Sequence, residues 1–140
     1  MFDHRETLFH AVAQLSRRLN AALRDALAPL GLQPAQFAAL TEIAGNEGIT
    51  QAHLAERLDV EQPGVARTLA GLEKDRLISR KSLGKGRAQG LYLTEAARAL
   101  LPQAAQRVMA ADRAVAHSLS RTEAMQLIDD LGLLAGEIPR

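Results

Sequence analysis

A cluster of arginine and lysine side chains between residues 67 and 87 has the clearest chemistry in this sequence. From residue 76 to residue 94 every charged side chain is basic, although the whole chain has a formal net charge of only +1. Positive charge is therefore concentrated in one stretch. Ammonium and guanidinium groups bind phosphate oxygens, and an arginine fork can also donate two hydrogen bonds to guanine. The cluster predicts a surface that binds double-stranded DNA.

The sequence offers little for catalysis or metal binding. It contains no cysteine, no HExxH or CxxC pattern and no glycine-rich phosphate loop. Glu6 and His10 are four residues apart and could supply half of a metal site with His4. They lie opposite the apolar stripe of their segment, however, where solvated polar residues are expected. We expect no catalytic residue, no metal site and no cofactor, so an enzyme is not predicted.

Two short helices have to position the first part of the basic cluster. In the first, Thr50 is a hydroxyl N-cap, and Leu54 and Leu58 recur at helical spacing. Residues 59–61 then break the pattern. The second helix starts at Gln62-Pro63, because proline has a fixed φ angle and lacks an N–H group that would be unsatisfied in a first turn. The pattern predicts two helices joined by a tight turn.

The second helix has two contrasting faces. Val65, Leu69 and Leu72 are spaced i, i+4 and i+7, which places them on one buried stripe. A slim cationic face lies opposite and can enter a DNA major groove. That face carries Pro63, Arg67, Ala70 and Lys74, with Gly64 and Gly71 placed more obliquely.

Contacts with bases are expected from the start and middle of this helix. Arg67 is best placed to bond guanine, Gln62 could pair with adenine, and Thr68 could contact a phosphate or a thymine methyl. An ordinary amphipathic helix with a solvated basic face is the alternative interpretation. The predicted DNA-contacting residues of the helix are Gln62, Pro63, Gly64, Arg67, Thr68 and Lys74.

A short hairpin is predicted after this helix. Residues 77–80 and 90–93 are apolar and β-prone, and Gly84 and Gly86 lie between them. A basic hairpin beside such a helix is typical of a winged helix, whose wing reaches the minor groove while neighbouring lysines touch phosphates. A solvated hairpin with glycine turns is the alternative. Wing and backbone contacts are expected from Thr50, Gln51, Arg76, Arg80, Lys81, Lys85 and Arg87.

The stretch LAERLDVEQPGVARTLAGLEKDRLISR, followed by LYLT at residues 91–94, resembles the MarR-type (multiple antibiotic resistance regulator) winged-helix transcription factors. By this resemblance, Arg87 matches the wing arginine that family members insert into the minor groove. Some positions depart from the family pattern. Lys85 stands where an aspartate is common, and Glu61 and Gly64 stand where serine and small hydroxyl residues are frequent. Because of these departures, the resemblance does not predict which operator sequence is bound or how the wing is oriented on it.

Both ends of the chain are predicted to be helical. Residues 4–28 carry a leucine-rich stripe, and Pro34 opens a second helix. After the wing, Thr94 is expected to cap a helix in which Pro102 causes a kink or marks the real first turn. Residues 120–123, with the sequence SRTE, form a capping box that starts a last helix.

These terminal helices have apolar stripes and no core of their own between them. Pairing two copies would bury the stripes. Residues 1–32 and 95–140 are therefore predicted to form a helical dimerisation region, and residues 33–94 the winged helix-turn-helix domain. A homodimer would set two recognition helices about 34 Å apart, which suits a near-palindromic site. A monomer whose terminal helices fold over the middle of the chain is the alternative.

The expected fold is mainly α-helical with a small β-hairpin wing, and the expected function is that of a dimeric, sequence-specific DNA-binding transcriptional regulator. The resemblance implies a repressor tuned by a small-molecule effector, often an aromatic or phenolic acid, whose pocket the sequence does not identify. A winged-helix protein-interaction module or antirepressor with an acidic partner is the alternative. Because no signal-peptide pattern and no apolar run of about 20 residues occurs, we expect a cytoplasmic protein without a membrane partner.

Overall fold

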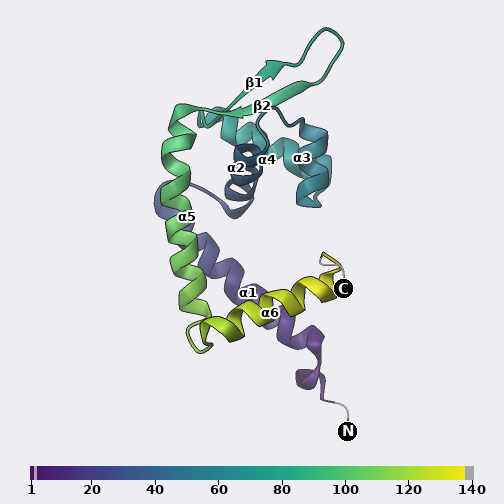
Figure 1. The fold of residues 1–140 in the computed structure, drawn as a ribbon, viewed down its shortest axis with the longest axis vertical. Helices are drawn as coiled ribbons and strands as arrows, with labels where there is room; N and C mark the ends of the chain where they lie inside the picture. The colour runs from purple at the N-terminus through teal and green to yellow at the C-terminus, as the bar shows by residue number, and fades with distance from the viewer. Residues whose placement is uncertain (2, 138–140) are drawn as a thin grey trace.

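The computed structural model describes residue 1 and residues 3–137, and it consists of helices with one β-hairpin, as the mainly helical fold class predicted. Figure 1 shows the hairpin at one end of an elongated molecule and the start of the first long helix at the other end. Two short 3-10 turns, His4–Glu6 and Ala28–Leu30, flank the first helix. The elements are α1 (Leu8–Leu27), α2 (Pro34–Gly45), α3 (Gln51–Leu58), α4 (Gln62–Lys74), β1 (Ile78–Ser82), β2 (Gln89–Leu93), α5 (Glu95–Val115) and α6 (Arg121–Ala135).

The core lies where α2, α3 and α4 pack against one another beneath the hairpin (Figure 1). Leu40 of α2 and Leu54 of α3 are fully buried there. The predicted buried stripe of α4, formed by Val65, Leu69 and Leu72, is confirmed. Complete burial of one such side chain stabilises the fold by about 1.5–3 kcal/mol. This core fixes α4 by one face only and leaves its other face outside.

The hairpin is attached to the helix-turn-helix by backbone hydrogen bonds. β1 and β2 are antiparallel, and Ile78 pairs with Leu93 at the base of the hairpin. The segment just before α3 pairs with the other edge of β2. There the Gly48 N–H donates to the Leu91 carbonyl at 2.9 Å, and the Leu91 N–H donates to the Ile49 carbonyl at 2.8 Å. The base of the wing therefore moves with the start of α3.

The ends of α3 and α4 confirm the predicted helix-turn-helix boundaries. The Thr50 hydroxyl accepts the His53 N–H at 3.2 Å and caps α3. Asp59 ends that helix with a φ of 51°, in the left-handed region that aspartate tolerates better than most residues. α4 then begins at Gln62, with Pro63 in its first turn.

The expected single helix over residues 4–28 is wrong at its start. The Asp3 carboxylate accepts the Arg5 N–H at 2.9 Å and forms the cap of the first 3-10 turn. α1 begins only at Leu8, where the Thr7 hydroxyl accepts the His10 N–H at 3.2 Å. Such side chains satisfy N–H groups that a longer helix would satisfy through its backbone, so they set the boundary.

α5 runs unbroken through Pro102, so the prediction that this proline marks the first turn is wrong. Pro102 is exposed, and Ala97 and Ala104 are fully buried on either side of it, which holds both halves of the helix in place. The predicted capping box of α6 is confirmed. The Ser120 N–H donates to the Glu123 carboxylate at 2.8 Å, and the Ser120 hydroxyl accepts the Glu123 N–H at 3.2 Å.

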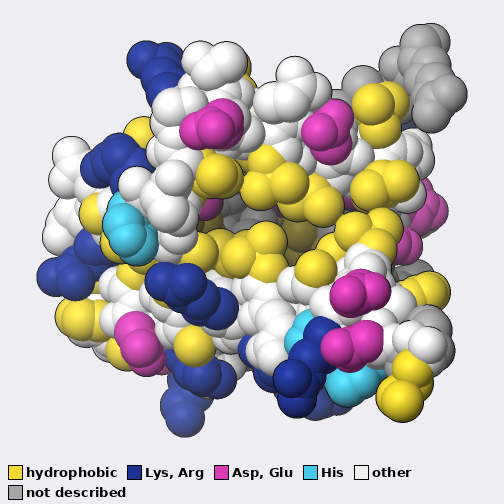
Figure 2. Space-filling view, turned by 90° about the horizontal axis from the view of Figure 1, so that it is seen from below, with side chains coloured by type: hydrophobic (Ala, Val, Ile, Leu, Met, Phe, Trp, Pro, Cys, Tyr) yellow, Lys and Arg dark blue, Asp and Glu magenta, His cyan; other side chains and the backbone are white. Residues whose placement is uncertain are grey.

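The terminal helices leave much apolar surface uncovered. α1 and α5 lie side by side, and α6 crosses the end of the molecule far from the hairpin (Figure 1). None of the residues of α6 is buried. Phe9 of α1 and Ile128 of α6 are 89% and 62% exposed. Figure 2, which views this end, shows hydrophobic side chains in yellow around a central hollow.

Candidate nucleic-acid interface

The outward face of α4 is open to solvent, as its spacing predicted. Pro63, Arg67, Ala70 and Lys74 are all exposed. Among the described residues, neither the Arg67 guanidinium nor the Lys74 ammonium takes part in an ion pair. A guanidinium that is free and mounted on a rigid helix can form the two parallel hydrogen bonds that distinguish guanine.

The small residues of α4 serve packing within the protein. A Cβ atom on Gly64 would lie 3.2 Å from Val60 Cγ1, and one on Gly71 would lie 3.1 Å from Gln36 Nε2. Thr68 is half-buried, and its hydroxyl donates to the Gly64 carbonyl at 3.1 Å. Gly64, Gly71 and Thr68 therefore have a structural role. DNA contacts from Gly64 and Thr68 stay predictions.

The start of α4 presents an acid beside its polar first turn. Glu61 is the N-cap residue, but its carboxylate makes no capping hydrogen bond and is exposed. Gln62 and Pro63, which follow it, are exposed as well. A carboxylate here is favoured by the helix dipole and opposed by DNA phosphates.

The end of the hairpin carries three cations, Lys81, Lys85 and Arg87, which we call the wing cations. All three are exposed. The loop between the strands bends at Gly84 and Gly86, whose φ angles of 131° and 73° lie in the region that favours glycine. The Arg87 N–H donates to the Gly84 carbonyl at 3.1 Å and closes the turn. Because no acid lies between residues 76 and 94, the wing cations act as one positive surface.

Arg80 differs from the wing cations because its guanidinium is bound within the protein. It pairs with Glu73 of α4 and donates hydrogen bonds to Gln51 of α3. The sequence predicted Arg80 and Gln51 as two separate DNA contacts and gave no role to Glu73. No periodicity or motif signals a triad whose members lie in two helices and a strand, so only tertiary structure could show it.

Two further predicted contacts lie at the ends of the helices. Arg76 follows α4 with a φ of 56°, its carbonyl accepts the Thr94 hydroxyl at 2.8 Å, and its side chain is exposed. The Thr50 hydroxyl is already engaged as the cap of α3. Arg76 thus continues the basic surface past the end of α4, whereas a phosphate contact from Thr50 stays a prediction.

Comparison with known proteins agrees with this geometry. Residues 30–88, a span from the end of the second 3-10 turn to the hairpin loop, match the model of the MarR family. The chain has the winged-helix fold and is similar to MarR-family proteins. The family resemblance seen in the sequence is thereby confirmed, and Lys85 and Glu61 are departures within a genuine MarR-type fold.

Solved MarR-type structures match this chain over nearly its whole length, including the terminal helices. The transcriptional repressor CouR, solved with a 23-mer DNA duplex, is 27% identical at a TM-score of 0.88, covering 96% of this chain and 98% of that chain. The MarR family protein Rv2887 of Mycobacterium tuberculosis, solved with DNA, is 26% identical at a TM-score of 0.77, covering 91% and 97%. Its complex with salicylic acid is 27% identical at a TM-score of 0.74, covering 91% and 96%.

This chain also has a small hollow of about 140 Å³ between α1 and α5. Its lining is apolar except for one carboxylate, that of Asp112. In the part of the chain that the structure describes, no group of three or more metal-ligating side chains could hold an ion. The same residues include no helix with the length and apolar character needed to cross a membrane. The hollow is lined by Leu19, Ala22, Leu23, Val108, Ala111 and Asp112.

Proposed function

We propose that this chain is a dimeric, sequence-specific DNA-binding transcriptional regulator that acts as a repressor. The observation that carries the proposal is the exposed face of α4, with Arg67 and Lys74 free of ion pairs among the described residues, next to the wing cations. The similarity to CouR and Rv2887, each solved with DNA, supports it. A helix held by one face and cationic on the other has the form required to enter a major groove.

Each part of the surface has a distinct role in the proposed complex. Arg67 and Gln62 contact base edges from α4, with guanine and adenine as their preferred partners. Arg87 enters the minor groove, and Lys81 and Lys85 contact phosphates beside it. Base contacts select the sequence, whereas phosphate contacts raise affinity for every sequence.

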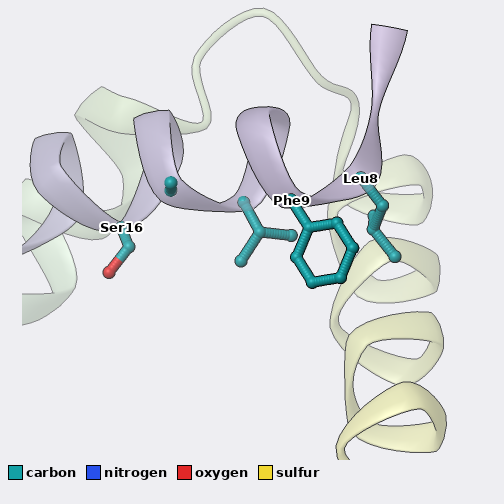
Figure 3. A pocket seen from close by; sticks show the side chains of 5 residues that line it. Leu8, Phe9 and Ser16 are labelled. Atoms are coloured by element: carbon teal, nitrogen blue, oxygen red, sulfur yellow. The ribbon is translucent and has the colours of Figure 1, made fainter. Parts of the chain in front are cut away.

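We propose that the terminal regions, residues 1–32 and 95–140, hold two copies of the chain together; Phe2 and residues 138–140 of these regions lie outside the described residues. An open hollow of about 430 Å³ on α1 is almost entirely apolar. Figure 3 shows Leu8, Phe9 and Ser16 projecting from α1 toward the same side. Helix α6 lies at the same end of the molecule (Figure 1), and several of its large apolar side chains are exposed. A second copy would bury both surfaces and set two α4 helices on one face of a duplex.

We propose in addition that a small aromatic effector binds the hollow between α1 and α5. The salicylic acid complex of Rv2887 supports this proposal, and the apolar lining suits an aromatic ring. The Asp112 carboxylate would repel an acid group, so the carboxylate of such a ligand would point away from it. The effector would act only through different affinities for the DNA-bound and free arrangements of the dimer.

Selection of bound duplexes from a random pool tests DNA recognition. We expect a near-palindromic consensus, a complex that resists nonspecific competitor DNA, and an affinity that falls steeply as salt rises. Absence of any competitor-resistant complex would instead support a protein-interaction module that uses the wing cations for an acidic partner. Salicylate added to the selected complex should weaken it, and an unchanged complex at saturating salicylate would remove the effector proposal alone.

Light scattering tests the dimer. The wild-type protein should have twice the protomer mass of 15.1 kDa at micromolar concentration. Ile128→Asp should shift the mass toward that of the protomer, because it places a charge in the proposed interface. The neighbouring substitution Asp129→Asn is the matched control and should leave the mass unchanged. A wild-type species of 15.1 kDa would contradict the dimer.

A further inference from the structure

Arg80 joins three elements of the proposed DNA-binding surface. Its Nε donates to the Glu73 carboxylate at 2.9 Å, and a terminal nitrogen lies 2.9 Å from the same oxygen. Both terminal nitrogens donate to Gln51 Oε1 at 3.3 Å. Arg80 belongs to β1, Glu73 to α4 and Gln51 to the first turn of α3. One guanidinium therefore links the wing, the recognition helix and the preceding helix.

This linkage requires the shape of arginine. A guanidinium is planar and has five N–H donors in fixed directions, so it can serve two acceptors on different sides at once. A lysine ammonium of the same charge is a compact group on a flexible stem and would serve one of them. The Arg80 side chain is 26% exposed and half-buried, whereas the wing cations are exposed. Its position is thus held by its partners.

The same contacts determine which way the Gln51 amide points. Only the amide oxygen can accept hydrogen bonds from Arg80, and that oxygen accepts two. The amide nitrogen must then point away from the guanidinium, with both N–H groups free of Arg80. A neutral donor at the start of α3 suits a phosphate oxygen, since such contacts commonly fix the register of a protein on a duplex.

The charge of Arg80 is also largely cancelled in place. Glu73 supplies a carboxylate at 2.9 Å, whereas no acid pairs with a wing cation among the described residues. Release of counterions from DNA, which produces the salt dependence of binding, comes from cations that neutralise phosphates. A neutralised Arg80 contributes little to that dependence.

We propose that Arg80 is a positioning residue, which orients the Gln51 amide toward the DNA backbone and fixes the wing relative to α4. This inference rests on the proposed DNA-binding function and replaces the prediction that Arg80 itself contacts a phosphate. Affinity is then sensitive to the geometry of residue 80 rather than to its charge.

The test is a salt titration of binding by fluorescence anisotropy, with one selected duplex and a set of variants. Arg80→Lys keeps the charge but cannot bridge both partners, and it should weaken binding roughly tenfold, as for loss of one hydrogen bond to a charged group. The slope of log affinity against log salt should not change. Gln51→Ala should lose DNA affinity to a similar extent. The double variant with Arg80→Lys and Gln51→Ala should bind DNA no more weakly than either single variant, because both changes remove the same contact. Lys81→Ala is the matched control and should reduce the slope by about 0.9.

Two results would overturn the inference. One is an Arg80→Lys protein that binds as tightly as wild type, since a phosphate ligand needs only its charge. The other is a double variant whose fold-loss of DNA affinity equals the product of the losses in Arg80→Lys and Gln51→Ala, because independent contacts would give that result. Gln51→Ala, which leaves the Arg80–Glu73 pair intact, keeps the test informative if residue 80 variants unfold. A wild-type protein that binds no selected duplex would overturn the proposed function itself, which separates the two failures.

Discussion

The ammonium nitrogen of Lys81 lies over the ring of Tyr92, 4.7 Å from its centroid. The two residues are on opposite strands, and Lys81 reaches Tyr92 diagonally because its direct partner is Gly90, which has no side chain in the way. A cation over an aromatic face at an exposed site gains about 0.5–1 kcal/mol. Lys81 is therefore the wing cation whose position the hairpin itself restrains, whereas Lys85 and Arg87 lie in the loop.

Substitution of Lys81 should weaken binding to all sequences alike. Lys81→Ala removes one positive charge from the wing without touching α4, so the preferred sequence should stay the same while affinity falls. Gel shifts with the selected duplex and with scrambled duplexes measure both effects. Arg121→Ala, at the start of α6 and far from the wing, is the matched control for loss of a positive charge. A changed base preference in Lys81→Ala would show that Lys81 reads sequence.

Substitution of Arg67 should relax sequence preference. Arg67→Ala removes the proposed bidentate contact with guanine, and discrimination at one base pair in each half-site should fall by about 1–3 kcal/mol. Selection from a random pool with wild type and variant in parallel measures the change position by position. Equal losses for every sequence, as expected for Lys81→Ala, would assign Arg67 to the DNA backbone instead.

Removal of the carboxylate at the start of α4 should tighten binding to nonspecific DNA. Glu61→Gln keeps the size of the side chain and removes a negative charge that makes no capping hydrogen bond. Repulsion of phosphates is lost, so affinity for random duplexes should rise severalfold. Asp129→Asn on α6 is the control for a change in net charge. Weaker binding, confined to sites with one particular cytosine, would show that Glu61 accepts from a cytosine amino group.

A methyl group at position 90 should destabilise the wing. Gly90 is buried, and a Cβ atom there would lie 2.9 Å from both the Gly48 carbonyl oxygen and Leu83 Cδ2. Because backbone cannot yield as a flexible side chain does, Gly90→Ala should lower the free energy of unfolding by about 1–3 kcal/mol. Gly45→Ala, where nothing lies within 4 Å, should be neutral or stabilising and is the control for urea denaturation. Equal stability of the two variants would contradict the close approach of Gly48 to the wing.

Local patterns predicted the elements of this chain well, because their causes are local. The spacing of Val65, Leu69 and Leu72 predicted the buried face of α4, and hydroxyl caps and a proline marked helix starts. Thr7 caps α1 in the same way, but the apolar stripe of residues 4–28 does not mark that cap, so the stripe alone predicted too early a start. Contacts between elements were out of reach, since Arg80 and Gln51 are brought together only when the hairpin folds against α3.

The sequence also could not show which basic side chains are free and which are bound to an acid within the protein. A basic residue in a basic stretch reads as a DNA ligand whether its charge is free, as for Arg67, or cancelled, as for Arg80. The difference depends on Glu73, which lies on the adjacent helix and would pass for ordinary solvated surface in the helical pattern. Spacing therefore located the basic surface but did not show which of its cations are free and which are paired within the protein.

The capping box of α6 should titrate at low pH. The Ser120 N–H donates to the Glu123 carboxylate at 2.8 Å, and this backbone hydrogen bond, followed by the side-chain bond with Ser120, lowers the pKa of Glu123 below its ordinary value of 4.5. A lowered pKa in the folded state means that the ionised cap stabilises α6 fully above pH 4.5 and is lost as the pH falls through the lowered value. The Ser120 amide resonance, followed by NMR, should shift with a midpoint below 4.5.

Glu123→Gln separates this titration from that of the other carboxylates. Glutamine can still accept the Ser120 N–H but has no proton to gain, so the low-pH shift of the Ser120 amide should disappear in this variant. Because Glu123 is fully exposed, the cap contributes to the stability of α6 rather than to that of the buried core. A dimer that depends on α6 should therefore dissociate earlier on acidification in wild type than in Glu123→Gln. A Ser120 midpoint at or above 4.5 would mean that the hydrogen bond does not favour the ionised carboxylate in solution.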